Sequence, residues 1–359
     1  MEKQQLEPKK REKNLYISYI KGVAIIGIIL IHLIDWSNMV LTSTGDTFKD
    51  LLQIAVFLFV FTSGSVVYFA YGHRSFAEQT KRLLYRGFQI IFLYYLYSII
   101  KLLVFDFSTE PLYYQFTNKN ALTIIDILLF RSFSVPIAIL ITFAFLLFVS
   151  PLILLVQKKS RYPKVAIGFM IAVVFIINYF TNAQSTTGPV IDLLYARGNV
   201  LFPTMLWLTP FLIGFFLALA GFEKQKGKIF LVSGALAIIS AALLAKGGKS
   251  LKLSDNEFPL APYFIFCSTF GLSLLLYFFS FLEKLKNRIV ISFMAILRLL
   301  GDDTLYLYLY QWVIIDCTIW IFPKRPTLIW LTVPAFFVCY LLIKRKKLLE
   351  YYYMQLKTA

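Results

Sequence analysis

Long apolar runs recur along the whole chain of 359 residues, each near the roughly 20 residues that an α-helix needs to span a bilayer. Inside lipid a backbone must satisfy its own hydrogen bonds, which only helices and closed barrels achieve, and apolar runs of this length are typical of helices. The composition, 59% hydrophobic and 18% aromatic, is far more apolar than that of a soluble domain. The sequence therefore predicts an all-α integral membrane protein that crosses the membrane many times.

About ten transmembrane helices are expected, and they form one domain over residues 15–343. Their approximate bounds are 15–34, 51–71, 83–105, 136–156, 165–180, 200–221, 229–245, 258–282, 304–322 and 328–343. A basic N-terminal segment, residues 1–14, and a basic tail, residues 344–359, flank this domain. No stretch between the runs is long and hydrophilic enough for a separate soluble domain.

The formal net charge of +17 raises the question of a nucleic-acid partner, and the distribution of Lys and Arg answers it. Most of these residues fall in alternate loops, including the segment 284–298, which we expect to be a loop, and in both terminal segments. By the positive-inside rule this side is cytoplasmic, so both termini are expected there and the protein in the cell membrane. The charge then indicates topology and attraction to anionic lipids, and no nucleic acid is expected as a partner.

Cysteine usage gives no sign of metal or disulfide chemistry. Cys267, Cys317 and Cys339 all lie in apolar runs, without CxxC or His-rich spacing. We expect them to be packing residues and expect no metal site.

Two ionisable residues lie inside the first apolar run, Lys21 and His32. Ionisable side chains within a membrane span are costly, so they indicate a functional site by default. Eleven residues at about 100° each complete about three turns, which puts both side chains on nearly the same helix face, roughly 16 Å apart along the axis. They are therefore expected to line one cavity, Lys21 nearer the cytoplasm and His32 farther out.

Asp35 follows His32 by three residues and falls on the same side of the helix. A carboxylate there would hold one ring nitrogen of His32 and orient it for acid/base work. The alternative is that Asp35 is the first solvated residue after the helix and that His32 is only a hydrogen-bonded packing residue.

A cation near the cytoplasm and an imidazole deeper in the membrane suit a long anionic donor that enters from the cytoplasm, such as a coenzyme A thioester. Lys21 would meet its phosphates while its extended arm carries the thioester toward His32. The histidine then either takes a proton from an acceptor or carries the acyl group itself.

Four stretches, in the right order, resemble the acyltransferase 3 family of membrane acyltransferases. The family's first helix is similar to residues 19–32, YIKGVAIIGIILIH, with a basic residue eleven positions before a histidine. Its second helix resembles 57–64, FLFVFTSG, and the start of its third helix resembles 81–86, KRLLYR. A late family segment is similar to 300–311, LGDDTLYLYLYQ.

This resemblance implies transfer of an acyl group, commonly acetyl, from a cytoplasmic donor to a glycan or lipid-linked sugar at the outer side. Acyl-CoA, with acetyl-CoA as the common case, would be a co-substrate, and no permanently bound cofactor is expected. The expected partners are the glycan acceptor, membrane lipids and a glycan-synthesis complex.

The same stretches supply supporting residues, each with an ordinary structural alternative. Arg82 and Arg86 share a helix face at i and i+4 and either clamp donor phosphates or anchor the helix to lipid phosphates. Ser63 and Gly64 carry little bulk and admit either the acyl arm or a neighbouring helix.

The chain departs from the family pattern at three positions. Lys21 replaces the usual arginine and lacks its bidentate fork, Ser18 replaces an acid, and Gln311 replaces a histidine found in many relatives. His32 is then expected to be the one candidate base in the helices. Asp302 and Asp303 are expected to cap the helix that follows them.

Two other classes of function remain open at this point. One is a transporter or flippase for a lipid-linked sugar or polar solute, with His32 as proton relay, for which acids in several spans would be expected. The other is a catalytically silent scaffold in a glycan-synthesis complex, which the three departures allow.

Overall fold

The structure is a computed structural model that describes residues 15–37, 42–104, 124–129, 134, 137–180, 204–257 and 261–358. The expected basic segment 1–14 lies outside the described residues. Within the described residues every regular element is helical and no strand ladder occurs.

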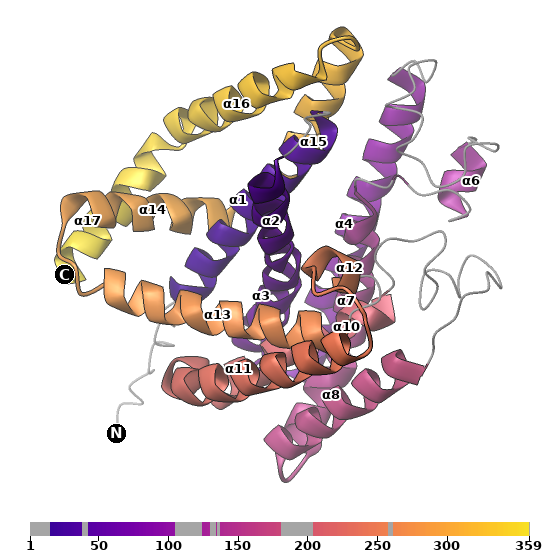
Figure 1. Ribbon diagram of the computed structural model, residues 1–359, viewed down its shortest axis with the longest axis vertical. Coiled ribbons are helices and arrows are strands. Elements are labelled where there is room, and N and C mark those ends of the chain that lie inside the picture. The colour runs from indigo at the N-terminus through magenta and orange to yellow at the C-terminus, as the bar shows by residue number, and fades with distance from the viewer. Residues whose placement is uncertain are drawn as a thin grey trace, which may run out of the picture.

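The helices follow one another along the chain as a series of long and short segments (Figure 1). Their bounds are α1 Leu15–Trp36, α2 Ser43–Leu52, α3 Ile54–Tyr71, α4 Phe76–Val104, α6 Ile124–Leu128, α7 Ala138–Lys159, α8 Pro163–Phe180, α10 Thr204–Ala220, α11 Phe222–Lys246, α12 Leu253–Glu257, α13 Pro262–Leu282, α14 Arg288–Asp302, α15 Thr304–Ile321, η2 Pro326–Leu328, α16 Ile329–Ile343 and α17 Arg345–Thr358.

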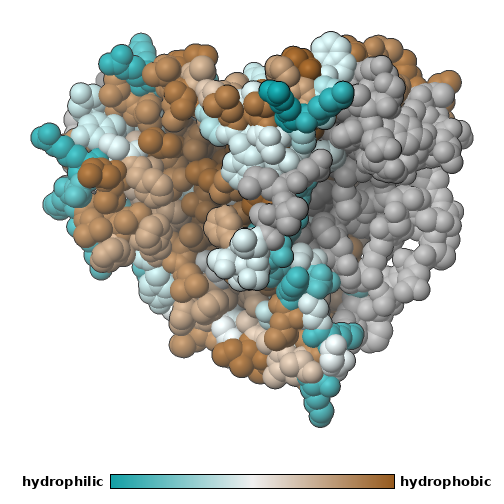
Figure 2. All heavy atoms as spheres, turned by 45° about the horizontal axis from the view of Figure 1, so that its top comes forward, coloured by the Kyte–Doolittle hydropathy of each residue, from teal (hydrophilic) through white to brown (hydrophobic). Residues whose placement is uncertain are grey.

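Among the described residues, eight helical segments are long and apolar enough to cross a membrane, with α2 and α3 counted together. Two shorter apolar helices, α8 and α10, accompany them. Each of the ten predicted runs overlaps one of these helices, so the prediction of an all-α integral membrane protein is confirmed. The number of crossings and the side on which the termini lie stay predictions. On the face that Figure 2 shows, broad hydrophobic areas lie over the coloured residues, and hydrophilic residues are seen at the edges and near the centre.

Glycine lets two pairs of helices cross at very short range. A Cβ atom on Gly301 of α14 would lie 1.9 Å from the Ser18 carbonyl oxygen of α1, and one on Gly22 would lie 2.3 Å from the Leu297 carbonyl oxygen. The α3–α10 crossing repeats this arrangement: a Cβ on Gly64 or on Gly214 would lie 1.9 Å from a carbonyl oxygen of the other helix. Both crossings therefore require a residue without a side chain.

The segment 284–298 is not the loop that we expected from its charge. Residues from Arg288 onward form α14, which buries Ile291, Met294 and Ala295 at helical spacing. At 15 residues, α14 is too short to span a bilayer, and its basic residues give the sequence the character of a loop. The packing of its apolar stripe on α1 explains why it is a helix.

The expected basic tail is also largely a helix, α17, and it returns to the start of α1. The Gln355 side chain donates a hydrogen bond of 2.7 Å to the Tyr19 hydroxyl, and the Arg298 guanidinium lies 4.1 Å from the centre of the Tyr351 ring. The start of α1 and the C-terminal helix thus lie at one end of the bundle.

Several basic segments meet at this same end, which is called the basic end from here on. Lys158 Nζ, in the last turn of α7, donates to the Arg74 carbonyl before α4. Lys226 Nζ at the start of α11 donates to Ser280 Oγ of α13 at 2.7 Å. The Tyr16 hydroxyl of α1 donates to Glu283. The contacts fit the loops that the charge pattern assigns to one side of the membrane.

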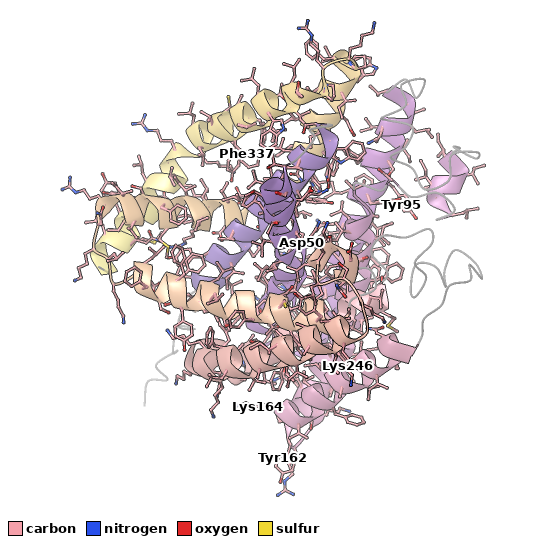
Figure 3. The ribbon with its side chains drawn as sticks, in the orientation of Figure 1. Asp50, Tyr95, Tyr162, Lys164, Lys246 and Phe337 are labelled. Atoms are coloured by element: carbon pink, nitrogen blue, oxygen red, sulfur yellow. The ribbon has the colours of Figure 1, made fainter. Side chains whose placement is uncertain are left out.

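At the other end, a short helix is held by an acid on α2. The Asp50 carboxylate, labelled in Figure 3, accepts backbone hydrogen bonds of 2.8 Å from Leu253 and Ser254, the first residues of α12. It therefore caps the exposed amides of that helix start.

Candidate functional site

A cavity of about 680 Å³ opens among α1, α3, α4, α7 and the junction of α14 with α15. Lys21 of α1, Ser63 of α3 and Arg86 of α4 all line it. Three of the residues singled out from separate parts of the sequence are thus brought to one space, which is called the donor cavity from here on.

Arg82 takes a different position from Arg86, although both lie on α4. Its guanidinium pairs with Glu78 on its own helix at 3.0 Å, half-exposed, and it does not line the donor cavity. Of the two arginines expected to clamp the donor phosphates, only Arg86 lines the cavity. Lys21 is the second cation there.

Ser63 and Gly64 also take different positions. Ser63 lines the donor cavity, and its hydroxyl donates to the Phe59 carbonyl of its own helix at 3.0 Å. Gly64 faces α10, whose backbone occupies the space next to it. Gly64 was expected to leave space for either the acyl arm or a neighbouring helix, and in the structure a helix, α10, occupies that space.

Two carboxylates line the donor cavity at the basic end. Asp302 accepts hydrogen bonds from Ser18 at 2.9 Å and from Tyr351 at 2.7 Å. Asp303 accepts from Tyr340 at 2.8 Å and pairs with Lys347 at 3.1 Å. The expectation that both cap the following helix is wrong for their side chains, because Asp303 occupies the N-cap position of α15 without a side-chain cap bond. They join α1, α16 and α17 instead.

These contacts determine the charge of Asp303. Burial raises the pKa of this carboxyl, but the hydrogen bonds from Tyr340 and Lys347 outweigh burial and lower its pKa overall. Lys344 at 3.3 Å acts in the same direction. Asp303 is therefore firmly ionised at neutral pH.

His32 is half-buried and packs against α15. The distance between its Nδ1 and Gln311 Nε2 is 2.9 Å, and its ring centre lies 4.3 Å from that of Trp312 and 6.1 Å from that of Tyr308. An amide can serve either imidazole tautomer, since its nitrogen donates and its oxygen accepts. Gln311 is thus the side chain that holds the histidine.

Asp35 does not make the contact expected for an orienting acid. Its carboxylate forms an ion pair with Lys49 of α2, and both side chains are about one-third exposed. The structure therefore assigns the Nδ1 partner of His32 to Gln311 and links Asp35 to the neighbouring short helix.

Aromatic side chains separate the donor cavity from His32. Phe59 and Phe143 line the cavity with ring centres 4.9 Å apart, and the Phe59 ring stacks on Tyr308 at 6.1 Å. Tyr308 is in turn the ring that meets His32. Lys21 and His32 thus both face the side of α1 toward α15, with one aromatic layer between the cavity and the imidazole.

The sequence analysis missed a buried ion pair between α4 and α15. Lys101 Nζ lies 2.8 Å from the Asp316 carboxylate, both side chains are at most 1% exposed, and the Tyr97 hydroxyl donates to the same carboxylate oxygen. The other oxygen, Oδ1, is buried without a partner among the described residues. In the sequence, Asp316 could have been found as an acid inside the apolar stretch 312–320. Because the helices contain this carboxylate, the expectation that His32 is the one candidate base in the helices is wrong.

Asp316 also places an acid in a second span, as a transporter would require. Because it is paired with Lys101 in a dry environment, its main effect in this structure is to join α4 to the helix that carries Gln311 and Trp312. Within the described residues, no group of three His, Cys, Asp or Glu side chains is close enough together to hold a metal ion.

Comparison with known proteins gives one result that covers nearly the whole chain. A family model described as an acyltransferase domain, of the acyltransferase 3 type, matches residues 14–344. No curated protein and no solved structure matches the chain. The matched region contains every helix from α1 to α16, with the donor cavity and His32 inside it. The chain therefore belongs to the acyltransferase 3 family and is a membrane acyltransferase.

Proposed function

We propose that this protein transfers an acyl group, acetyl in the common case, from cytoplasmic acyl-CoA to a hydroxyl of a glycan or lipid-linked sugar across the membrane. The observation that carries the proposal is a cavity with two cations at its basic end that extends to an aromatic layer in contact with His32. The glycan acceptor rests on the family resemblance.

Lys21 and Arg86 suit the phosphates of the donor, because a guanidinium offers paired donors and an ammonium offers a point charge. Asp302 and Asp303 line the same cavity and would repel an anion if their charges were uncompensated. Lys347 and Lys344 lie on Asp303, so the local charge that a phosphate meets stays positive. A charged mouth with aromatic and aliphatic walls beyond it matches a donor with a charged head and a long neutral arm.

The thioester must travel from the cations to the imidazole, roughly 16 Å along α1 at 1.5 Å per residue. Phe59 and Tyr308 stand on this path and must turn aside for the arm to pass. The layer thereby keeps water from the reactive end until the donor arrives, which limits hydrolysis of the thioester.

His32 then removes the proton from the acceptor hydroxyl, and the oxygen attacks the thioester carbonyl carbon. The carbon–sulfur bond breaks, the ester forms, and the proton on His32 passes to the departing thiolate of coenzyme A. For Nε2 to accept this proton, Nδ1 must carry the ring hydrogen and donate it to the amide oxygen of Gln311, so the amide turns from the orientation that places its nitrogen 2.9 Å from Nδ1. A covalent route, with the acyl group first on Nε2 and then on the acceptor, needs the same neutral ring and remains the second possibility.

Binding of acyl-CoA to the purified protein tests the proposed donor site directly. Lys21→Gln and Arg86→Gln should each lower affinity about tenfold, as loss of one hydrogen bond to a charged group implies. Arg82→Gln removes the same charge from the same helix outside the cavity and should change affinity less than about threefold. Equal losses in Arg82→Gln and Arg86→Gln, or no saturable binding by the wild type, would contradict the proposal.

A further inference from the structure

A second cavity, of about 460 Å³, lies among α8, α10, α11 and α13 and shares no lining residue with the donor cavity. Its volume falls within the range of about 300–1,000 Å³ typical of small-molecule sites. It is called the lateral crevice from here on. Its lining differs between its two ends, and this difference indicates the ligand.

One end of the lateral crevice is cationic. Lys164, in the first turn of α8, and Lys228, near the start of α11, line it together with Gln225. Figure 3 labels Lys164 at the start of α8 and Lys246 at the opposite end of α11. Because α8 and α11 both begin at the basic end, this part of the crevice lies at the level where lipid headgroups would be.

The remainder of the lateral crevice is apolar. Ile213, Phe216, Leu236 and Phe266 line it. The two hydroxyls there are used within their own helices: Ser233 donates to the Ile229 carbonyl at 2.5 Å and Thr269 to the Ile265 carbonyl at 2.7 Å. A ligand in this part therefore needs a hydrocarbon chain rather than polar groups.

The crevice is also open toward the surrounding lipid. Val232, which lines it, is 59% exposed, and Ile238 farther along α11 is 72% exposed. Only 6% of the apolar window of α11 is buried within the molecule. A bilayer lipid can therefore enter from the side.

The two lysines have no partner that would neutralise them in the part of the chain that the structure describes. Among the described side chains, neither Lys164 nor Lys228 forms an ion pair or hydrogen bond. Lys226, two residues before Lys228, is by contrast engaged, with Ser280 at 2.7 Å and the Tyr277 ring at 5.2 Å. The pair at the crevice thus leaves two positive charges for a ligand beside an apolar channel.

We propose that the lateral crevice binds one anionic phospholipid of the cytoplasmic leaflet, with its phosphate on Lys164 and Lys228 and an acyl chain along α11 and α13. Charge complementarity selects an anionic headgroup, and the apolar remainder selects a lipid over free phosphate. This site is independent of the donor cavity, and its occupancy goes beyond the proposed transfer reaction.

Binding of fluorescent phosphatidylglycerol to the full-length protein in neutral detergent tests the proposal. Each lysine near the headgroup contributes about fivefold in affinity, so Lys164→Gln with Lys228→Gln should weaken binding about 25-fold. The control, Lys81→Gln with Lys346→Gln, removes the same charge from exposed residues at the basic end and should change affinity less than threefold. Leu236→Trp fills the apolar part with both lysines kept and should also weaken binding.

Unlabelled ligands that compete with the fluorescent probe for the wild-type protein complete the test without any variant. Unlabelled phosphatidylglycerol should displace the probe, whereas phosphatidylcholine and millimolar inorganic phosphate should not. Displacement by phosphatidylcholine at equal concentration, displacement by phosphate alone, or equal losses in the two lysine double variants would overturn the assignment. Preferential displacement by a polyprenyl phosphate would also overturn it, because the occupant would then be a lipid-linked carrier.

Discussion

The position of His32 is determined by its neighbours on α15 as much as by its own helix. Gln311 holds one ring nitrogen and Trp312 covers the ring. A glutamine stays neutral over the whole pH range, so it orients the imidazole without adding a charge beside it. Gln311 therefore has a positioning role in the proposed reaction.

Gln311→Leu should lower kcat about tenfold with little change in KM for acyl-CoA, since one hydrogen bond to a titrating group is lost far from the donor cations. Gln311→His restores a ring donor and acceptor and should recover most of the rate. Steady-state kinetics in proteoliposomes check this. A rise in KM with unchanged kcat would show that Gln311 acts in donor binding instead.

The pair of Lys101 and Asp316 is expected to matter through stability. Asp316→Asn or Lys101→Met leaves one buried group without its partner, which costs about 3–5 kcal/mol. The double variant Lys101→Met with Asp316→Leu removes both charges and should cost clearly less than either single change. Thermal unfolding in detergent measures these effects.

The exposed pair of Arg82 and Glu78 provides the comparison for this prediction. Its removal should change stability by less than about 1 kcal/mol, because both side chains are half-exposed. If Asp316→Asn were as mild as Arg82→Gln, the buried pair would contribute little to the junction of α4 and α15.

Among the helices, α14 connects the carboxylates that line the donor cavity to α1. Gly301 brings the two backbones together, and Ser18 next to it donates to Asp302. The short amphipathic helix thus determines where Lys21 lies relative to the start of α15. A change in the distance or angle between α1 and α14 would displace the donor cavity without altering a catalytic group.

Gly301→Ala should destabilise the protein by about 1–3 kcal/mol, because the added Cβ would lie 1.9 Å from the Ser18 carbonyl. Gly168→Ala on α8 is the matched control, since its Cβ would meet only a Phe216 ring atom at 4.0 Å. Melting temperature and expression level report the difference. Equal tolerance of both changes would mean that the α1–α14 approach is looser than described.

The docking of α17 should weaken in acid. The pKa of Asp303 is lowered in the folded protein, so the contribution of this carboxylate to stability is present above its ordinary pKa and is lost as pH falls through the lowered pKa. Proteolysis within α17 should therefore increase steeply below about pH 4. Asp303→Asn should show faster cleavage already at neutral pH and a weaker pH dependence, and an unchanged profile would contradict this link.

At the scale of the molecule, one end is basic and carries the mouth of the donor cavity, the start of α1 and α17. The donor is soluble and cytoplasmic in the proposed reaction, so this end must face the cytoplasm. The opposite end, with Asp50 and α12, must then face outward.

Single cysteines test this orientation in a background without Cys267, Cys317 and Cys339. An impermeant maleimide applied to intact cells should label Lys249→Cys, which follows α11, and should not label Ser160→Cys, which follows α7. Both should react after permeabilisation. Reversed labelling would place the donor cavity on the wrong side.

The sequence was sufficient for the positions of the long helices and for the shared face of Lys21 and His32, because both depend on the period of a single helix. It was insufficient for α14, whose apolar stripe is short and lies between basic residues. The partners of Asp35 and Arg82 depend on which side chains lie nearby in space, and neither apolar periodicity nor family motifs specify that. Asp316 was visible as an acid in an apolar run, but its role required the position of Lys101.

The central claim is that His32 performs acyl transfer to a glycan, and the acyl content of surface glycans tests it most directly. Mass spectrometry would compare a deletion strain with strains that carry equal membrane amounts of wild type, His32→Ala or Gly168→Ala. The account predicts that His32→Ala matches the deletion and that Gly168→Ala matches the wild type. Parental acylation with the His32→Ala protein would contradict it.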